Sequence, residues 1–576
     1  MQEPKLSRLR GRNISGNVAQ FRAIPQKKLT NQLPDFRDKS SISASSGLEP
    51  YLGLWNESAQ MHLLKRTLFG FKSSDLMSIQ SLNLNQAVEL ILTLDPEPAP
   101  PVNDYHYPEE GIIDPDVAPG ESWIEAPYNN DYEGARLVSL KGWIINNMLE
   151  QPTSIHEKMI LFWHNLLVTQ SWGVFIAKAS YQYFKTLRTH ALGNFKQLVK
   201  AITLDPSMLI YLNGTFNNKE APDENYAREL QELFCVGKGP NSKFTESDVQ
   251  AAAKVLTGWV VSVESLENEG KPQSFYYPPF HEESDKTFSE FYENRIIVGK
   301  SGPDGEAELD ELLDMIFENE ETALYLSRRI YQFFVYNEID DFTEQNVIVP
   351  LAQLLRENDY DVKPVLTSLF NSAHFYDPAN RGAVIKNPAD FLIGTWKALE
   401  ISRLGTSNSL NRLLNHRSML WNMADQGMEI GDPPSVSGWP AYYQAPQFDK
   451  YWITTDTITS RAIMTDSLWY WGFWVSQDLR VNADLIQIVS QLNEQLDSNL
   501  MLREITSKVF GISMDDSSLQ HLKTVLLNGQ SSDAYWTSAW LQLQADPGNQ
   551  EIRSVVENRL KATFQHIFQM GESQLM

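Results

Sequence analysis

Helical periodicity of the apolar residues runs through almost the whole chain beyond its first 45 residues. Apolar side chains recur every three to four positions, and clusters of Gly, Pro and Asn interrupt the pattern at spacings that suit helices of ordinary length. The 576 residues are enough to bury at least one large core. We therefore predict a mainly α, large multi-helix globular protein.

Two segments depart from this pattern. Residues 94–127 contain eight prolines and several Asp and Glu residues, which predicts a long, largely irregular surface loop. Residues 259–300 combine short β-prone runs with Gly and Pro, which predicts one or two short β-hairpins inserted between helices. Loops of such length often carry function or move.

Two capping sequences predict helix starts. Ser154 and Glu157 stand three positions apart ahead of an apolar helical run, and Thr245 and Asp248 have the same spacing. In a capping box the two side chains satisfy each other's backbone N–H groups at the first turn of a helix. We expect a helix to begin at each of these two places.

The N-terminal residues differ from the rest of the chain in charge. Residues 1–40 hold nine Lys or Arg and three Asp or Glu, a net of +6 in a chain of formal net charge −25. We expect residues 1–45 to form a basic, disordered or extended tail, residues 46–465 a mainly helical core, and residues 466–576 a C-terminal helical region. Because an acidic body repels nucleic acid, no nucleic-acid partner is expected.

The sequence contains no membrane-span pattern and one cysteine. The longest uncharged run, residues 159–177, includes His, Asn, Thr, Gln, Ser and Gly, so no membrane span is expected. The absence of an apolar secretory signal in residues 1–40 makes the cytoplasm the default location. The single cysteine, Cys235, excludes an intramolecular disulfide and a Cys-rich zinc site, and we expect it to be buried.

Common metal and cofactor motifs are missing from the sequence. The ten histidines form no His-Glu-x-x-His and no His-x-His pattern, and none follows a Glu by three residues. There is no complete nucleotide-binding loop, no haem motif and no Gly-x-Ser-x-Gly elbow. The residues therefore indicate no cofactor and leave the metal content open.

Residues 225–237 are the most suggestive segment chemically. At about 100° per residue they form one apolar face, which we expect to enter the core, and one polar face made of Asn225, Arg228, Glu229 and Glu232. Two carboxylates three positions apart can flank a cation or divide acid and base roles. The same four residues also suit an exposed helix face with an ion pair between positions i and i+4.

Other polar and aromatic residues stand within apolar segments. His164 lies away from the apolar stripe of its expected helix, which makes it a candidate acid, base or metal ligand. His281 and Lys286 lie in the β-rich insertion, and the rigid turn at 432–440 orients Trp439. Each also has a structural interpretation, as a hydrogen-bonded histidine, a solvated loop charge or a core tryptophan.

These residues lie in sequence blocks that resemble a known family. Over about residues 59–461 the chain is similar to the bacterial family called domain of unknown function 1800. The similar blocks, all in the family's order, are 62–70, 162–165, 192–195, 205–212, 224–233, 244–249, 256–259, 281–288 and 433–440. The resemblance implies an α-helical bacterial protein and no established activity.

The resemblance also implies a biological setting. Family members are often exported and often encoded beside a second uncharacterised family that looks sulfatase-like, which implies export and a protein partner. Leu166 stands where the family often has a second histidine, which weakens a two-histidine metal site. Residues 1–40 show no apolar signal segment, and this argues against the export that the resemblance implies.

All of the candidate residues fall within these blocks, so we expect their side chains to line one cleft. The candidate catalytic residues are Glu229, Glu232 and His164. The candidate ligand-binding residues are Asn165, Asn225, Arg228, Trp259, His281, Lys286 and Trp439.

Three classes of function remain open from the sequence. The leading one is a helical binding or enzyme-accessory protein with a polar, acidic and aromatic cleft for a polar or polymeric ligand. The second is a hydrolase or lyase that uses paired carboxylates and a histidine, with or without a metal. The third is a structural component of an assembly.

Overall fold

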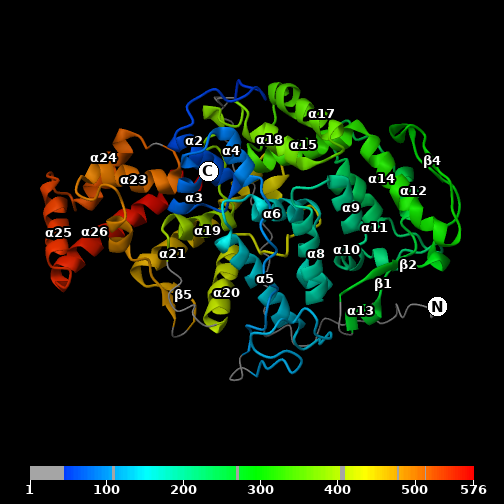
Figure 1. Ribbon diagram of the computed structural model, residues 1–576, viewed down its shortest axis with the longest axis horizontal. Coiled ribbons are helices and arrows are strands. Elements are labelled where there is room, and N and C mark those ends of the chain that lie inside the picture. The colour runs from blue at the N-terminus through cyan, green and yellow to red at the C-terminus, as the bar shows by residue number, and fades with distance from the viewer. Residues whose placement is uncertain (1–43, 107–110, 268–270, 402–408, 477–478, 513) are drawn as a thin grey trace.

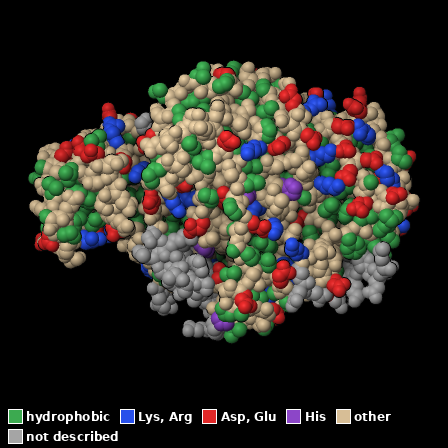
Figure 2. Space-filling model, in the orientation of Figure 1, with side chains coloured by type: hydrophobic (Ala, Val, Ile, Leu, Met, Phe, Trp, Pro, Cys, Tyr) green, Lys and Arg blue, Asp and Glu red, His purple; other side chains and the backbone are tan. Residues whose placement is uncertain are grey.

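A computed structural model describes residues 44–576 except 107–110, 268–270, 402–408, 477–478 and 513. The predicted tail at 1–45 lies outside these residues, apart from positions 44 and 45. In Figure 1 the molecule is elongated, with the late helices (orange and red) at one end and the strands near β1–β4 (green) at the other. Acidic side chains are spread over the face seen in Figure 2, in keeping with the negative net charge.

The mainly α prediction is confirmed. The helices of the first part of the chain are α2 (Glu57–Thr67), α3 (Ser73–Gln80), α4 (Leu84–Ile91), α5 (Glu133–Glu150), α6 (His156–Leu166), α7 (Ser171–Val174), α8 (Ala177–Thr189), α9 (Phe195–Thr203), α10 (Pro206–Tyr211), α11 (Glu224–Glu229), α12 (Glu246–Val255) and α13 (Val263–Glu267). The later helices are α14 (Glu308–Glu318), α15 (Glu320–Phe334), α16 (Asp341–Thr343), α17 (Val349–Glu357), α18 (Val362–Phe370), α19 (Pro388–Ala398), α20 (Ser409–Asp425), α21 (Thr455–Tyr470), α22 (Leu485–Ser490), α23 (Ser498–Phe510), α24 (Asp516–Leu526), α25 (Ala534–Ala545) and α26 (Gln550–Gln569).

Short 3-10 and π turns connect these helices. The 3-10 turns are η2 (Gly214–Phe216), η4 (Pro278–Phe280), η5 (Glu290–Tyr292), η6 (Gly302–Ala307), η8 (Pro378–Asn380), η9 (Pro440–Tyr442), η10 (Phe448–Trp452) and η11 (Gly571–Gln574). The π turns are η3 (Leu230–Cys235) and η7 (Glu344–Ile348).

The strands form short antiparallel hairpins. The predicted insertion at 259–300 contains two of them, β1 (Trp259–Val261) with β2 (Ser274–Tyr276), and β3 (Lys286–Thr287) with β4 (Ile296–Ile297), as expected from its sequence. A third, unpredicted hairpin joins β5 (Phe473–Trp474) to β6 (Arg480–Val481). In the first hairpin Trp259 is paired with Tyr276, and the centres of their rings lie 5.4 Å apart.

Both predicted helix starts are confirmed, but only one of them has the predicted capping box. Thr245 and Asp248 form a capping box at the start of α12. Helix α6 instead begins at His156 without a capping box, and Ser154 Oγ accepts a hydrogen bond from the His156 backbone N–H at 3.2 Å. Glu157 is buried, and its carboxylate pairs with Arg188 of α8. Burying a carboxylate without a positive partner costs more free energy than leaving a helix end uncapped, so the Glu157 side chain pairs with Arg188 and does not cap the helix.

Residues 225–237 do not form one uniform α-helix. After α11 the chain changes to the π turn η3, where the backbone N–H groups of Val236 and Gly237 both donate to Gln231 O, at 2.9 and 3.0 Å. Such a turn shifts the following residues relative to the 3.6-residue pattern. Gln231 is consequently buried, and its amide oxygen accepts a hydrogen bond from the Tyr292 hydroxyl at 2.9 Å. Cys235 is fully buried, as predicted.

The proline-rich segment at 94–127 has no helix or strand in its described residues. It nevertheless contributes to the core, because Tyr105 and Trp123 are buried. Asp114 accepts a hydrogen bond from the Tyr105 hydroxyl at 2.7 Å and pairs with Arg136 of α5 at 2.9 Å. These contacts attach the segment to the central helices.

The C-terminal residues return to the middle of the molecule (Figure 1). Leu575 forms an isolated bridge with Ile385, and the backbone N–H of Met576 donates to Val384 O at 2.9 Å. Gln574 accepts a hydrogen bond from Arg461 at 3.1 Å. The proposed division near residue 465 stays a prediction. No helix in the described residues is long and apolar enough to cross a bilayer.

Candidate functional site

The structure places the ten candidate residues in three groups. The first group is His164, Asn165 and Trp439, the second is Asn225, Arg228, Glu229 and Glu232, and the third is Trp259, His281 and Lys286. The hydrogen bonds and ion pairs of the three groups share no residue among the described ones. The contacts therefore do not support a single cleft shared by all ten, and that expectation stays a prediction.

The first group is buried where α6 meets the turn at 432–440. The backbone N–H of Trp439 donates to Asn165 Oδ1 at 2.9 Å, and the rings of His164 and Trp439 lie 5.7 Å apart in an edge-to-face arrangement. All three side chains are almost completely buried. They join two distant sequence blocks in the core and do not face solvent.

His164 is held as a neutral imidazole. The Tyr183 hydroxyl donates to Leu167 O at 2.7 Å, so its oxygen accepts from His164 Nδ1 at 3.0 Å. Burial, reinforced by the positive charge of Lys141, lowers the pKa of His164 to about 3. The other ring nitrogen, Nε2, is buried without a hydrogen-bond partner. The neutral imidazole of His164 could accept a proton, as a general base does, but the surrounding aromatic rings block access from solvent.

Beside this group lies a charged cluster that the sequence did not indicate. Lys141 of α5 is fully buried and contacts Glu429 and Asp432, each at 2.6 Å. Asp432 also accepts from the Ser171 hydroxyl at 2.5 Å and from the Trp172 backbone N–H at 2.9 Å. Burial raises the pKa of Asp432 even with Lys141 beside it. The residue types are common in any sequence, and only packing brings them together.

The second group is a partly exposed ion-pair cluster. The Arg228 side chain, 32% exposed, contacts Glu224 at 3.0 Å and Glu232 at 3.7 Å, and it also pairs with Glu246 of α12. These carboxylates raise the pKa of Arg228, and the largest cause is the hydrogen bond that Arg228 donates to Glu246. Asn225 is exposed, and its amide donates to Leu212 O at 3.4 Å. The predicted pairing of Arg228 with Glu232 is thus present, at the surface.

Glu229 differs from its neighbours in this group. Partial burial raises the pKa of its carboxyl, and the negative charge of Glu232 adds to the effect. Tyr211 has its pKa raised to about 12 by burial and by the charges of Asp432 and Glu229. Tyr211 therefore lies near both the Glu229 face and the Lys141 cluster.

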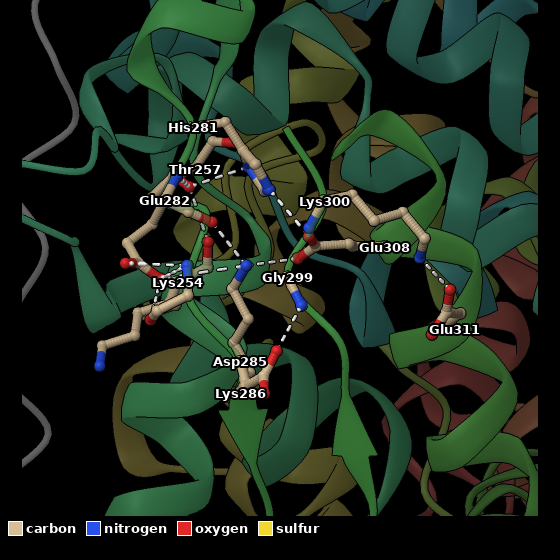
Figure 3. Close-up of polar contacts among 12 residues, drawn as sticks. Lys254, Thr257, His281, Glu282, Asp285, Lys286, Gly299, Lys300, Glu308 and Glu311 are labelled. Atoms are coloured by element: carbon tan, nitrogen blue, oxygen red, sulfur yellow. Dashed lines mark hydrogen bonds and ion pairs between the residues drawn. The ribbon is translucent and has the colours of Figure 1, made fainter. Parts of the chain in front are cut away.

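The third group is a closed network at the base of the β-rich insertion (Figure 3). His281 Nε2 lies 3.1 Å from Glu308 Oε1, and Lys286 Nζ lies 2.6 Å from Glu308 Oε2. All three side chains are buried, and the Lys300 backbone N–H also donates to Glu308 at 2.7 Å. Burial alone would raise the pKa of Glu308, but the hydrogen bonds from His281 and Lys286 bring it below its ordinary value.

This network supports the wall of a cleft. Glu308 is the first residue of α14 and directly follows the turn η6. Gly305 of η6 packs so tightly that an added Cβ would lie 2.6 Å from the His281 ring. Trp259 connects to the network through Tyr276, whose ring lies 5.4 Å from that of Trp259 and 5.5 Å from that of His281.

The cleft itself lies between α9, β1 and the η6–α14 corner. It has a volume of about 330 Å³ and is lined by Lys200, Leu204, Trp259, Pro303, Asp304, Glu306, Ala307, Leu309 and Asp310. Its acidic residues are exposed, and Lys200 pairs with Asp310 at 2.5 Å. Of the ten candidates, Trp259 alone is among the described residues that line this cleft. His281 and Lys286 do not line it but contact the buried Glu308 next to its wall.

Glu308 and the acidic lining residues were not among the candidates predicted from the sequence. They lie in a run of Asp and Glu between 304 and 311, which looks like ordinary solvated surface. The one available signal was the Gly and Pro content of 302–305, which marks a tight turn ahead of a helix. No group of three or more His, Cys, Asp or Glu side chains in the described part of the chain is arranged to hold a metal ion.

Comparison with known proteins gives a family and no function. Residues 62–550 match the family described as "Protein of unknown function (DUF1800)". No curated protein and no solved structure matches the chain. The matched region contains all three groups and the cleft beside Trp259.

Proposed function

We propose that this chain, which belongs to the DUF1800 family of proteins of unknown function, is a binding protein whose ligand occupies the cleft beside Trp259. The observation that carries the proposal is the cleft of about 330 Å³ with a tryptophan and three carboxylates in its lining. This volume lies at the lower end of the range of small-molecule sites. The ligand class is a small polar molecule that carries at least one ammonium or guanidinium group.

Charge supports a cationic ligand. Asp304, Glu306 and Asp310 line the cleft, and Lys200 is the only basic residue among the described residues that line it. Carboxylates on low-dielectric walls attract cations, and the chain as a whole is acidic. A ligand ammonium would compete with Lys200 for Asp310, which lies 2.5 Å from Lys200.

The tryptophan supports the same ligand class. The face of a tryptophan ring attracts cations, and its flat apolar surface packs against the carbon skeleton of a small amine. Trp259 is only 6% exposed, and its position is fixed by strand pairing with Tyr276. A ring that is already immobile loses little entropy when a ligand binds.

The buried network supports a preformed cleft wall. His281 and Lys286 both contact Glu308, so the corner between η6 and α14 is held by polar contacts that solvent does not reach. A site whose supporting contacts are already made binds more tightly than one that must order itself. The proposal gives His281 and Lys286 a positioning role, and it assigns no role in the cleft to Glu229, Glu232 or His164.

The test is calorimetric titration of the full chain with spermidine, arginine and choline, with glucose and glutamate as uncharged and anionic comparisons. We expect saturable binding of at least one cation, weakened by salt because the attraction is electrostatic. The triple variant D304N/E306Q/D310N changes exposed side chains only and should abolish the binding. Trp259→Phe should weaken it while keeping an aromatic ring.

A matched control separates the cleft from net charge. The variant E89Q/D516N/D546N makes the same charge change at exposed positions outside the cleft lining, and it should bind as the unmodified chain does. Absence of saturable binding for every cation, or equal losses in the two triple variants, would refute the proposed site.

A further inference from the structure

A second site is indicated where α2, α19 and α23 meet, far along the chain from the cleft beside Trp259. A small cavity of about 30 Å³ is lined by Lys65, Lys386, Lys508 and Asp390, with apolar and glycine residues completing the wall. It adjoins a surface cleft of about 200 Å³, because Ala398, Lys508 and Val509 line both. The inner cavity has room for a water molecule or two, or for one small anionic group.

The inner cavity has more positive than negative charge around it. Among the described residues that line it, Asp390 is the only acidic one, and its carboxylate already pairs with Lys158 and accepts a hydrogen bond from Asn387. The described contacts of Lys65 and Lys386 include no carboxylate. Lys508 has a distant partner, Glu504, at 3.6 Å.

Neither buried ammonium is saturated by the protein. Lys65 Nζ donates to Val509 O at 2.7 Å, at the C-terminal end of α23, and Lys386 Nζ donates to Ser573 O at 2.7 Å. An ammonium has three N–H donors, so each retains donors beyond its described hydrogen bond. The guanidinium of Arg461, whose Nη2 donates to Lys386 O at 2.8 Å, also has a buried N–H without a partner at Nε.

The energetics of these lysines also favour an anionic partner. Burial, with the charge of Lys386 added, moves the pKa of Lys65 well below its ordinary value, and burial lowers the pKa of Lys386 to about 8. Two like charges that face one cavity repel each other, and the charge of Asp390 offsets the desolvation of Lys386 only in part. An anion between them would offset both effects.

We propose that this cavity binds a small oxyanion, a phosphate or carboxylate group, held by Lys65, Lys386 and Lys508. The group is either a free ion or the head of a ligand whose uncharged part lies in the adjoining cleft, where Leu399, Ile488 and Leu492 provide apolar surface. The alternative is purely structural, with Lys65 capping α23 and Lys386 anchoring the turn η11.

Calorimetric titration of the full chain with inorganic phosphate at pH 7 and constant ionic strength tests the proposal. We expect saturable binding at one site per chain, weakened at least about tenfold in Lys65→Met and in Lys386→Met because each removes a charged donor. Lys363→Met, which removes an exposed lysine of α18, serves as the control and should bind as before. Absence of saturable binding, or unchanged binding in both cavity variants, overturns the proposal.

Two further measurements complete the test. Titration with phenyl phosphate distinguishes the two sources, because tighter binding than inorganic phosphate indicates a ligand head group and equal binding indicates a free ion. If a lysine variant does not fold, crystals of the unmodified chain soaked in bromide decide the matter. An anomalous peak between Lys65 and Lys386 supports the proposal, and an empty cavity refutes it.

Discussion

The backbone N–H of Trp439 donates to the side-chain oxygen of Asn165 at 2.9 Å, across 274 positions of sequence. This bond connects helix α6 to the turn that precedes η9, and both partners are buried. The turn approaches α6 so closely that position 438 has no room for a side chain. The position also has a φ of +86°, a conformation that favours glycine.

Gly438→Ala should therefore destabilise the protein by several kcal/mol. An added Cβ would lie 2.5 Å from Asn165 O, in addition to the strain of the positive φ. Gly427→Ala is the control, because Gly427 has a φ of +97° but nothing within 4 Å of the added Cβ. Urea unfolding should show the larger loss for Gly438→Ala, and equal losses would contradict the close approach.

Glu308→Gln should cost about 3–5 kcal/mol of unfolding free energy, because it leaves the buried charge of Lys286 without its partner. Glu311, on the same helix as Glu308, forms a partly exposed pair with Lys300, and Glu311→Gln should cost less than about 1 kcal/mol. Denaturant unfolding of the two variants measures the difference. The double variant Lys286→Met with Glu308→Gln should recover part of the loss, and failure to recover any would argue against the pairing.

Arg228→Ala should change the unfolding free energy by less than about 1 kcal/mol, and adding Glu232→Ala should change it little further. Solvent screens this cluster, since Glu246 is 59% exposed and Arg228 is 32% exposed. Arg188→Ala is the comparison, because it removes the partner of the buried Glu157 and should cost about 3–5 kcal/mol. A loss of several kcal/mol for Arg228→Ala would show that its cluster is not an ordinary surface network.

The protonation of Asp205 should make stability depend on pH. Burial raises the pKa of its carboxyl to about 7 in the folded chain, against 3.8 for the ordinary group, even though the Ser207 backbone N–H donates to it. The unfolded chain therefore releases this proton at lower pH. The contribution of Asp205 to stability is present below about pH 4 and is lost as the pH rises to about 7.

Asp205→Asn should remove that dependence while keeping the cap of α10, since the asparagine oxygen can accept the same hydrogen bond. From pH 5 to pH 8 the stability of the natural chain should fall relative to the variant by a few kcal/mol, at about 1.4 kcal/mol per pKa unit. Urea unfolding at the two pH values measures this change. A stability difference that is the same at both would show that Asp205 is already ionised at pH 5.

The candidate sites were predictable from the sequence only in part. The polar face at 225–237 and its pairing of Arg228 with Glu232 follow from helical spacing, which is a local property. The π turn η3 shifts Gln231 out of that spacing, and the partner of its buried amide oxygen, the Tyr292 hydroxyl of η5, lies 61 positions away in sequence. His164 likewise looked like an open candidate, yet Tyr183 and Trp439 enclose it.

The sequence by itself determined the mainly α class, the two hairpins of the insertion, the family and the burial of Cys235, because periodicity, turn residues and motif order are written along the chain. Only the tertiary structure decided which charges are buried. From the sequence alone we would expect charged residues such as Lys65, Lys141 and Glu308 at the surface. Their burial depends on partners contributed by other segments of the chain. A charged side chain can be buried only where it finds ion-pair or hydrogen-bond partners, and tertiary packing decides where those partners lie.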